Sequence, residues 1–108
     1  MTTMKPRVLV IDDVRTFEEA DYHARTAQDG MYQLEKKGPW AMLLLDHDLA
    51  SYNDFRQEIT GYDILCWLEK PENLKYVPDR IALITSNPVG RENMQRVIDS
   101  IHQKLGAI

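Results

Sequence analysis

Three short segments of the chain end in polar side chains that could bind a metal ion and a phosphate group. The first ends in Asp12 and Asp13, the second continues into residues 46–48 (Asp-His-Asp), and the third ends in residues 85–87 (Thr-Ser-Asn). Each set directly follows a run of apolar residues. Carboxylate, hydroxyl and amide oxygens suit Mg²⁺, which commonly takes protein carboxylates together with waters and a substrate phosphate. The three sets together predict a site for magnesium and phosphate.

The candidate metal ligands are the acids Asp12, Asp13 and Asp46. Carboxylates that share a site repel one another, and one of them is forced to a higher pKa unless a positive charge lies among them. A divalent cation is the simplest such charge, so Mg²⁺ is the cofactor that we expect. Each acid taken alone could equally cap a turn or a helix, but two acidic clusters at strand ends favour the metal site.

Residues beside these acids are the candidates for proton transfer. His47 lies between two carboxylates, which makes it a candidate general acid or a phosphate-binding cation. A histidine that only makes hydrogen bonds within its own loop, with no role in catalysis, explains this position equally well. Asp48 is the other candidate for proton transfer, and we place Asp46 and Thr85 with it in the catalytic set.

The segment TSNPVG at 85–90 could hold the phosphate. It joins short hydroxyl and amide side chains to the start of a helix, whose free backbone N–H groups form an anion site. The candidate phosphate-binding residues are Ser86, Asn87 and Gly90, with Arg15 as a guanidinium that can bond two oxygens at once. The alternative is a plain helix cap by Ser86 or Asn87, and the two interpretations are compatible.

The elements that must position these residues alternate between strands and helices. Short apolar runs rich in β-branched residues at 7–13, 41–46 and 80–86 predict strands buried on both faces, and residues 22–27 predict another. Helical patterns lie between the strands, as expected for a parallel sheet. In such a sheet, ligands bind outside the carboxyl ends of the strands. The acids and the Thr-Ser-Asn set are therefore expected to meet at one edge.

Three helices are expected, each with a recognisable start or end. The first lies within residues 27–38, the second begins after Thr60 and ends before Pro71, and the last covers residues 88–106. In the second and the last, apolar residues recur three and four positions apart, as on the buried face of a helix.

Two connections depart from this regular plan. Residues 14–21 are too few for an ordinary crossover helix and predict a truncated turn or one short helix. Residues 50–59 are polar and predict a loop or an irregular insertion beside the end of the third strand. The aromatic residues of that insertion, Tyr52 and Phe55, could form a contact surface, although aromatics in such a loop more often pack on the core.

The composition indicates one domain over residues 1–108. Hydrophobic residues make up 44% and charged residues 28%, as in an ordinary globular protein. The net charge of −4, with lysine and arginine scattered along the chain, argues against an extended nucleic-acid surface. No signal-peptide pattern and no apolar run of membrane-spanning length occurs, and the single cysteine, Cys66, fits a reducing compartment. We therefore expect a cytoplasmic protein that does not enter a membrane.

The motifs described above resemble those of the receiver domains of response regulators. The shared features are VLVIDD near the start, LLLD before His47, and a hydroxyl residue at the end of the fourth strand. The resemblance implies that Asp12 and Asp13 hold Mg²⁺, that Asp46 accepts a phosphoryl group, and that Thr85 contacts that group. It also implies a flavodoxin-like, three-layer α/β fold, here with a shortened parallel sheet of about four strands that lacks the usual fifth strand and its lysine.

A more specific resemblance is to the cyclic-phosphate processing receiver domains, a divergent family of small proteins of bacteria and phages. The chain shares with them the acid pair followed by Arg15, LDHDL at 45–49, TGYD at 60–63, and NPVG followed by ENM within 87–94. The resemblance implies that the protein handles a cyclic phosphate end of RNA or of a nucleotide. Where a histidine is expected before the hydroxyl pair, this chain has Ile84.

Three functions stay open on the sequence alone. The first is a Mg²⁺-dependent phosphoesterase that acts on a cyclic phosphate or a related phosphoryl ligand. The second is a non-enzymatic interaction module, such as a phage-type protein that binds a host protein through Tyr52 and Phe55. The third is a phosphoacceptor in two-component signalling, against which the missing lysine argues.

Overall fold

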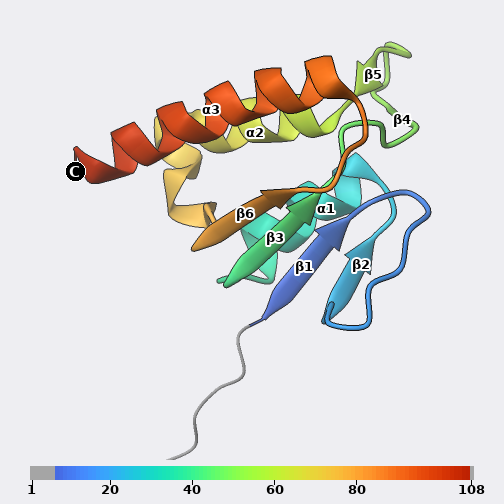
Figure 1. The fold of residues 1–108 in the computed structure, drawn as a ribbon, viewed down its shortest axis with the longest axis horizontal. Helices are drawn as coiled ribbons and strands as arrows, with labels where there is room; N and C mark the ends of the chain where they lie inside the picture. The colour runs from blue at the N-terminus through green and yellow to red at the C-terminus, as the bar shows by residue number, and fades with distance from the viewer. Residues whose placement is uncertain (1–6, 108) are drawn as a thin grey trace, which may run out of the picture.

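The computed structural model describes residues 7–107 and shows an α/β domain built on one parallel sheet. The sheet consists of β1 (Val8–Ile11), β2 (Tyr22–Ala24), β3 (Met42–Leu45) and β6 (Arg80–Leu83), in the order β2-β1-β3-β6 (Figure 1). All pairings in it are parallel. The chain moves outward from β1 to β2 and then crosses back to β3. The topological switch point, where ligands bind in such sheets, therefore lies between β1 and β3.

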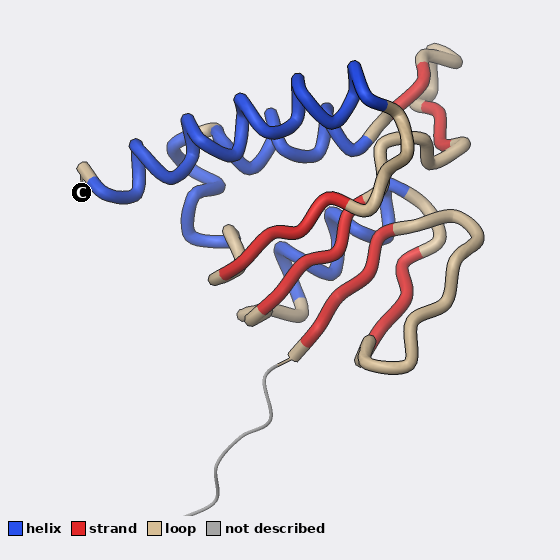
Figure 2. The backbone as a smooth tube through the Cα atoms, viewed as in Figure 1, coloured by secondary structure: helices blue, strands red, loops and turns tan. Residues whose placement is uncertain are grey.

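Helices follow β2, the segment of residues 50–59 and β6, and the α-helices begin at well-defined caps. Their bounds are α1 (Ala27–Lys36), α2 (Gly61–Glu69), the 3₁₀ helix η1 (Pro71–Tyr76) and α3 (Pro88–Gly106) (Figure 2). The α-helices start at Thr26, Thr60 and Asn87, whose side chains each accept a backbone N–H of the first turn. At Thr60 the cap is reciprocal, because Asp63 accepts the Thr60 N–H in return. None of the described helices has the length and apolar composition needed to cross a membrane.

One face of the sheet carries the hydrophobic core. Its buried strand residues, which alternate with those of the opposite face, are Leu9, Ile11, Ala24, Leu43 and Leu45. The same core includes apolar side chains from every α-helix: Leu34 from α1, Ile64, Leu65 and Leu68 from α2, and Met94, Ile98 and Ile101 from α3. All the described α-helices therefore cover the same face, and burial of these side chains is the main favourable term for the fold.

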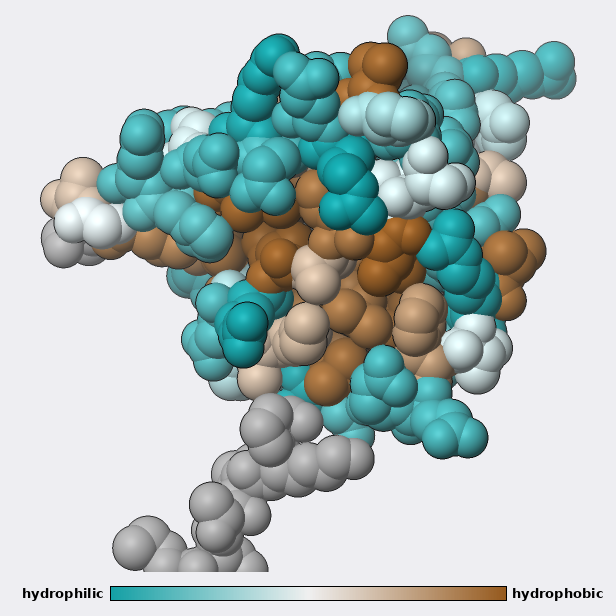
Figure 3. Space-filling view, viewed as in Figure 1, coloured by the Kyte–Doolittle hydropathy of each residue, from teal (hydrophilic) through white to brown (hydrophobic). Residues whose placement is uncertain are grey.

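The opposite face of the sheet has no helix packed on it within residues 7–107. His23, Val10, Leu44 and Ala82 lie side by side in a row across this face. Val10 is fully buried and Leu44 is nearly so, whereas Ala82 is only partly buried. Figure 3, in the same view as Figure 1, shows apolar side chains gathered over the sheet. The Phe17 N–H donates to His23 Nε2 at 2.9 Å, so the loop after β1 lies over this face beside β2.

The shortened parallel sheet predicted from the sequence is confirmed, and among the described residues no fifth strand pairs with β6. Residues 14–21, expected as a truncated turn or a short helix, form an irregular loop with turns. Because this segment is too short for a crossover helix, a loop takes the place of helices in the expected third layer, as far as residues 7–107 are concerned. Residues 50–59, expected to be irregular, contain the antiparallel pair β4 (Ser51–Tyr52) and β5 (Glu58–Ile59).

The β4–β5 hairpin projects from the end of the sheet where the strands finish (Figure 1). The Gly61 N–H donates to the His47 carbonyl at 2.9 Å and closes the base of this excursion. At the outer end, Phe55 is 84% exposed and Tyr52 is 58% exposed. These two aromatic side chains therefore do not pack on the hydrophobic core.

Candidate metal and phosphate site

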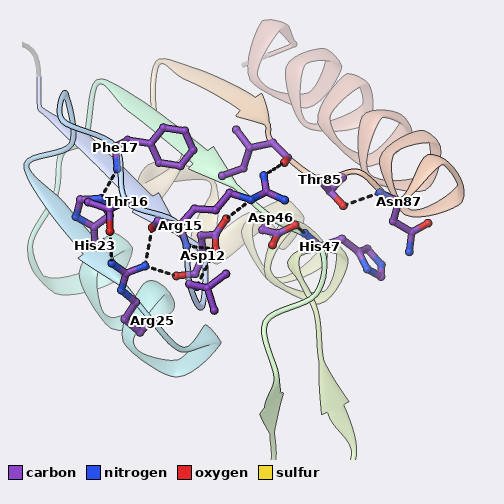
Figure 4. Close-up of polar contacts among 12 residues, drawn as sticks. Asp12, Arg15, Thr16, Phe17, His23, Arg25, Asp46, His47, Thr85 and Asn87 are labelled. Atoms are coloured by element: carbon purple, nitrogen blue, oxygen red, sulfur yellow. Dashed lines mark hydrogen bonds and ion pairs between the residues drawn. The ribbon is translucent and has the colours of Figure 1, made fainter.

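The acids that follow β1 and β3 meet at one rim of the sheet (Figure 4). Oxygen atoms of Asp12, Asp13 and Asp46 lie within 4.8 Å of one another. The register explains this meeting, because Ile11 and Leu45 are paired neighbours and an acid follows each of them. The Asp46 N–H also donates to the Ile11 carbonyl at 3.0 Å. Two adjacent strands that end level with each other thus place their carboxylates at the switch point.

The Asp46 carboxylate is buried in a negatively charged neighbourhood. Burial raises its pKa above the ordinary value, and the charge of Asp12 raises it further. The His47 backbone N–H, which donates to Oδ1 at 2.8 Å, acts in the opposite direction, as do Arg15 and the Thr85 hydroxyl. The net direction is upward. The ionised form of Asp46 is therefore destabilised until more positive charge approaches it.

This raised pKa predicts that the stability of the metal-free protein depends on pH. The unfolded chain releases the Asp46 proton near 3.8, whereas the folded protein holds it to higher pH. The stability that this group contributes is therefore fully present below the unfolded value and is lost as the pH rises through the raised folded value. Asp46→Asn has no such charge and should be more stable than the wild type by about 1 kcal/mol at neutral pH in EDTA.

Urea unfolding of the two proteins at about pH 4 and about pH 7 measures the effect. The gap between them should widen as the pH rises. A gap of the same size at both pH values would contradict the assignment.

Asp12 has one carboxylate oxygen that the protein satisfies and one that it does not. Oδ1 accepts the backbone N–H groups of Val14 and Arg15, each at 2.9 Å. Oδ2 is buried and accepts no hydrogen bond from the described residues, although Arg15 Nε lies 3.6 Å away as an ion pair. A buried carboxylate oxygen without a hydrogen bond is unfavourable unless a cation approaches it. The donor set of the cluster therefore fits Mg²⁺, which prefers such oxygens.

Arg15 supplies positive charge beside these acids. Its guanidinium forms the ion pair with Asp12 and also donates from Nη1 to the Ile84 carbonyl at the end of β6. The side chain is 42% exposed, so part of the guanidinium faces solvent at the rim. Arg15, predicted from the sequence to bind phosphate, thus lies at the rim and links the loop after β1 to the segment after β6 that carries Thr85.

His47 is held between Asp48 and the start of α3. His47 Nδ1 lies 2.9 Å from Asp48 Oδ1, while the Asp48 side chain is largely exposed and lies outside the acid cluster. A Cβ added at Gly90 would approach His47 Cδ2 to 2.7 Å, so the absence of a side chain at Gly90 lets the imidazole pack on the helix. With Nδ1 occupied by Asp48, Nε2 is the ring nitrogen left to exchange a proton.

Residues 85–87 form the cap of α3. Asn87 Oδ1 accepts the Gly90 N–H at 3.0 Å, and Thr85 Oγ1 accepts the Asn87 N–H at 3.0 Å. The helix cap given above as the alternative to phosphate binding is therefore present, with Asn87 as the capping residue. Thr85 is buried and close enough to Asp46 to lower the pKa of that acid, whereas Ser86 is exposed at the rim. The Thr85 hydroxyl is thus engaged with Asn87 and Asp46, whereas the Ser86 side chain faces solvent at the rim.

Sequence reasoning missed two residues that shape this site. Arg25, at the end of β2, donates to backbone and side-chain oxygens of the loop that carries Asp13. Gly61 lies so close to Asp46 that a Cβ would approach the Asp46 carbonyl oxygen to 2.1 Å. An arginine at a strand end carries no signal that separates it from a surface charge. The glycine could have been recognised only from its place in the TGYD motif.

A family model described as cyclic-phosphate processing receiver domain matches residues 7–100. The match spans the whole sheet and every rim residue discussed above. No curated protein and no solved structure matches the chain.

Proposed function

The chain belongs to the cyclic-phosphate processing receiver domain family, and on that premise we propose that it binds Mg²⁺ at its acid cluster and hydrolyses a cyclic phosphate on RNA or on a nucleotide. The observation that carries the proposal is the meeting of Asp12, Asp13 and Asp46 within 4.8 Å, with the Arg15 guanidinium beside them. The acids suit a divalent cation, and the guanidinium suits phosphate oxygens.

The reaction adds one water to the cyclic phosphate. A bond from phosphorus to the water oxygen forms, and one bond from phosphorus to a ribose oxygen breaks. The water loses a proton and the released ribose oxygen gains one, so the reaction needs no other reactant. When bound, Mg²⁺ supplies positive charge to the phosphoryl oxygens and lowers the pKa of bound water. Asp12, Asp13 and Asp46 would hold the ion.

The remaining rim residues would transfer the proton and bind the phosphate. Asp48 fixes the imidazole of His47 through Nδ1 and leaves Nε2 to take or give a proton. Arg15 and Thr85 would bind phosphoryl oxygens through a charge and a hydroxyl. Such donors stabilise the negative charge that develops on these oxygens, which is usually the largest catalytic term.

³¹P NMR of the protein with Mg²⁺ and nucleoside 2′,3′-cyclic phosphates, or RNA ends that carry the same group, tests this function. We expect turnover that requires Mg²⁺ and that falls by at least about 100-fold in Asp46→Asn. His47→Gln should lose about 100-fold if it transfers the proton. The matched control is Asp79→Asn, an exposed acid just before β6 at the other end of the strand. Absence of turnover on the whole panel in Mg²⁺ would refute the proposal.

The exposed hairpin favours a second candidate function, a non-enzymatic module that binds a host protein. Phe55 and Tyr52 expose most of their surface at the end of the projecting β4–β5 pair, and aromatic anchors are enriched among the residues that dominate interfaces. This function would replace the first if no turnover is found and if wild-type protein retains a host partner that Phe55→Ser does not.

A further inference from the structure

The loop after β1 carries part of the metal site but has no regular structure of its own. It runs over residues 12–21 and includes Asp13 and Arg15. None of these residues belongs to a helix or a strand. The N–H groups of Val14 and Arg15 bond to Asp12 Oδ1 and form a turn at the start of the loop. The position of the rest of the loop must therefore be fixed from outside.

Arg25 reaches this loop from the end of β2 (Figure 4). Its Nη1 donates to the Arg15 carbonyl at 2.6 Å and to the Asp12 carbonyl at 3.3 Å, and its Nη2 donates to Thr16 Oγ1 at 2.9 Å. A guanidinium is a rigid fork, so its donors hold these three oxygens in a fixed relation to each other. The Arg25 side chain thus joins the backbone of Asp12, a proposed metal ligand, to the backbone of Arg15.

Arg25 itself stands on a fixed part of the fold. Ala24, which precedes it, is fully buried, and the Ala24 carbonyl accepts the Asp12 N–H at 3.1 Å. Thr26, which follows it, caps α1 through its side chain. The backbone of Arg25 is therefore held on both sides, and its guanidinium transmits that fixed position to the loop.

We propose that Arg25 is a positioning residue of the metal site. Its hydrogen bonds to the site residues go to the backbone carbonyls of Asp12 and Arg15 and not to the carboxylates, so it sets where the acids and the Arg15 guanidinium lie without binding the ion. The effect on the ion rests on the proposed function. The ordering of the loop does not, because every contact of Arg25 described above is made by the protein alone.

Arg25→Met tests the proposal, because it keeps the aliphatic stem and removes the hydrogen bonds. In metal-free protein, amide hydrogen exchange within residues 13–17 should become at least about tenfold faster. The affinity for Mn²⁺, used as a paramagnetic probe and measured by EPR titration, should fall about tenfold. Arg25→Lys should recover part of both losses, since an ammonium can bond one of the carbonyls. Thr16→Val removes one of the bonds and should show smaller changes in the same direction.

Arg7→Met is the matched control. Arg7 makes equivalent bonds from Nη1 to the carbonyls of Lys37 and Pro39, at the other end of the sheet. Its replacement should leave the exchange of residues 13–17 and the Mn²⁺ affinity unchanged. Wild-type affinity retained in Arg25→Met would overturn the positioning role, whether or not the loop exchanges faster. Failure of the wild-type protein itself to bind Mn²⁺ would instead refute the proposed function, so the two failures are distinguishable.

Discussion

Gly61→Ala is expected to destabilise the protein by about 3 kcal/mol or more, the upper end of what overpacking costs. A Cβ at this position would lie 2.1 Å from the Asp46 carbonyl oxygen and 2.7 Å from Met94 Cε. The oxygen belongs to backbone that follows β3 directly, so it cannot turn away as a side chain would. Relief would require α2 to move away from the strand end, which would also break the Gly61 to His47 hydrogen bond.

Urea unfolding of Gly61→Ala beside Gly106→Ala measures this effect. A Cβ at Gly106 meets no atom within 4 Å, and Gly106 lies at the end of α3, where alanine is the better helix former. The control should therefore be as stable as the wild type or more stable by up to about 1 kcal/mol. If Gly61→Ala loses no more than about 1 kcal/mol, the close approach of α2 to Asp46 is not as tight as described.

Asp12→Asn is expected to weaken the binding of Mg²⁺ by about 100-fold, as losses at or next to metal ligands do. The amide keeps an oxygen for the Val14 and Arg15 N–H groups that Oδ1 now accepts. The amide NH₂ group replaces Oδ2, the buried oxygen that accepts no hydrogen bond, and an NH₂ group repels a cation. The fold should therefore survive a change that removes this proposed metal ligand.

Isothermal titration with Mg²⁺ compares Asp12→Asn with the wild type, and circular dichroism checks that the variant is folded. Asp54→Asn, which changes an exposed acid in the projecting hairpin, is the control for a general loss of negative charge. A folded Asp12→Asn protein that binds Mg²⁺ like the wild type would remove Asp12 from the ligand set.

The parallel sheet and the place of the acids could be predicted from the sequence because both depend on local patterns. The apolar runs that end in acids at 13 and 46 are long enough to be strands buried on both faces, and buried parallel strands bring their carboxyl ends to one rim. Thr60 could be predicted as a helix cap for a similar reason, since a hydroxyl residue three positions before Asp63 is a local signal.

The features that could not be predicted depend on contacts between distant segments. Residues 50–59 form a hairpin partly because Ser51 Oγ accepts the Ala27 N–H at the start of α1, and no local pattern announces that bond. Likewise, nothing in the sequence separates Arg25 from an ordinary surface arginine. Its role depends on the fold, which brings the Arg15 carbonyl to its guanidinium. Within residues 7–107, the absence of helices from one face follows from the shortness of residues 14–21, whose loop conformation only tertiary contacts decide.

The loop after β1 contributes both to the proposed metal site and to the cover of the sheet, since it carries Asp13 and lies over the face that includes Val10 and His23. An ion that binds only the native chain raises the free energy of unfolding, by about 2.7 kcal/mol when its concentration is a hundred times its dissociation constant. Proteases cleave chains in which such a loop has opened, and they act in proportion to the open population when opening is fast. Magnesium occupancy would then govern how long each molecule escapes degradation.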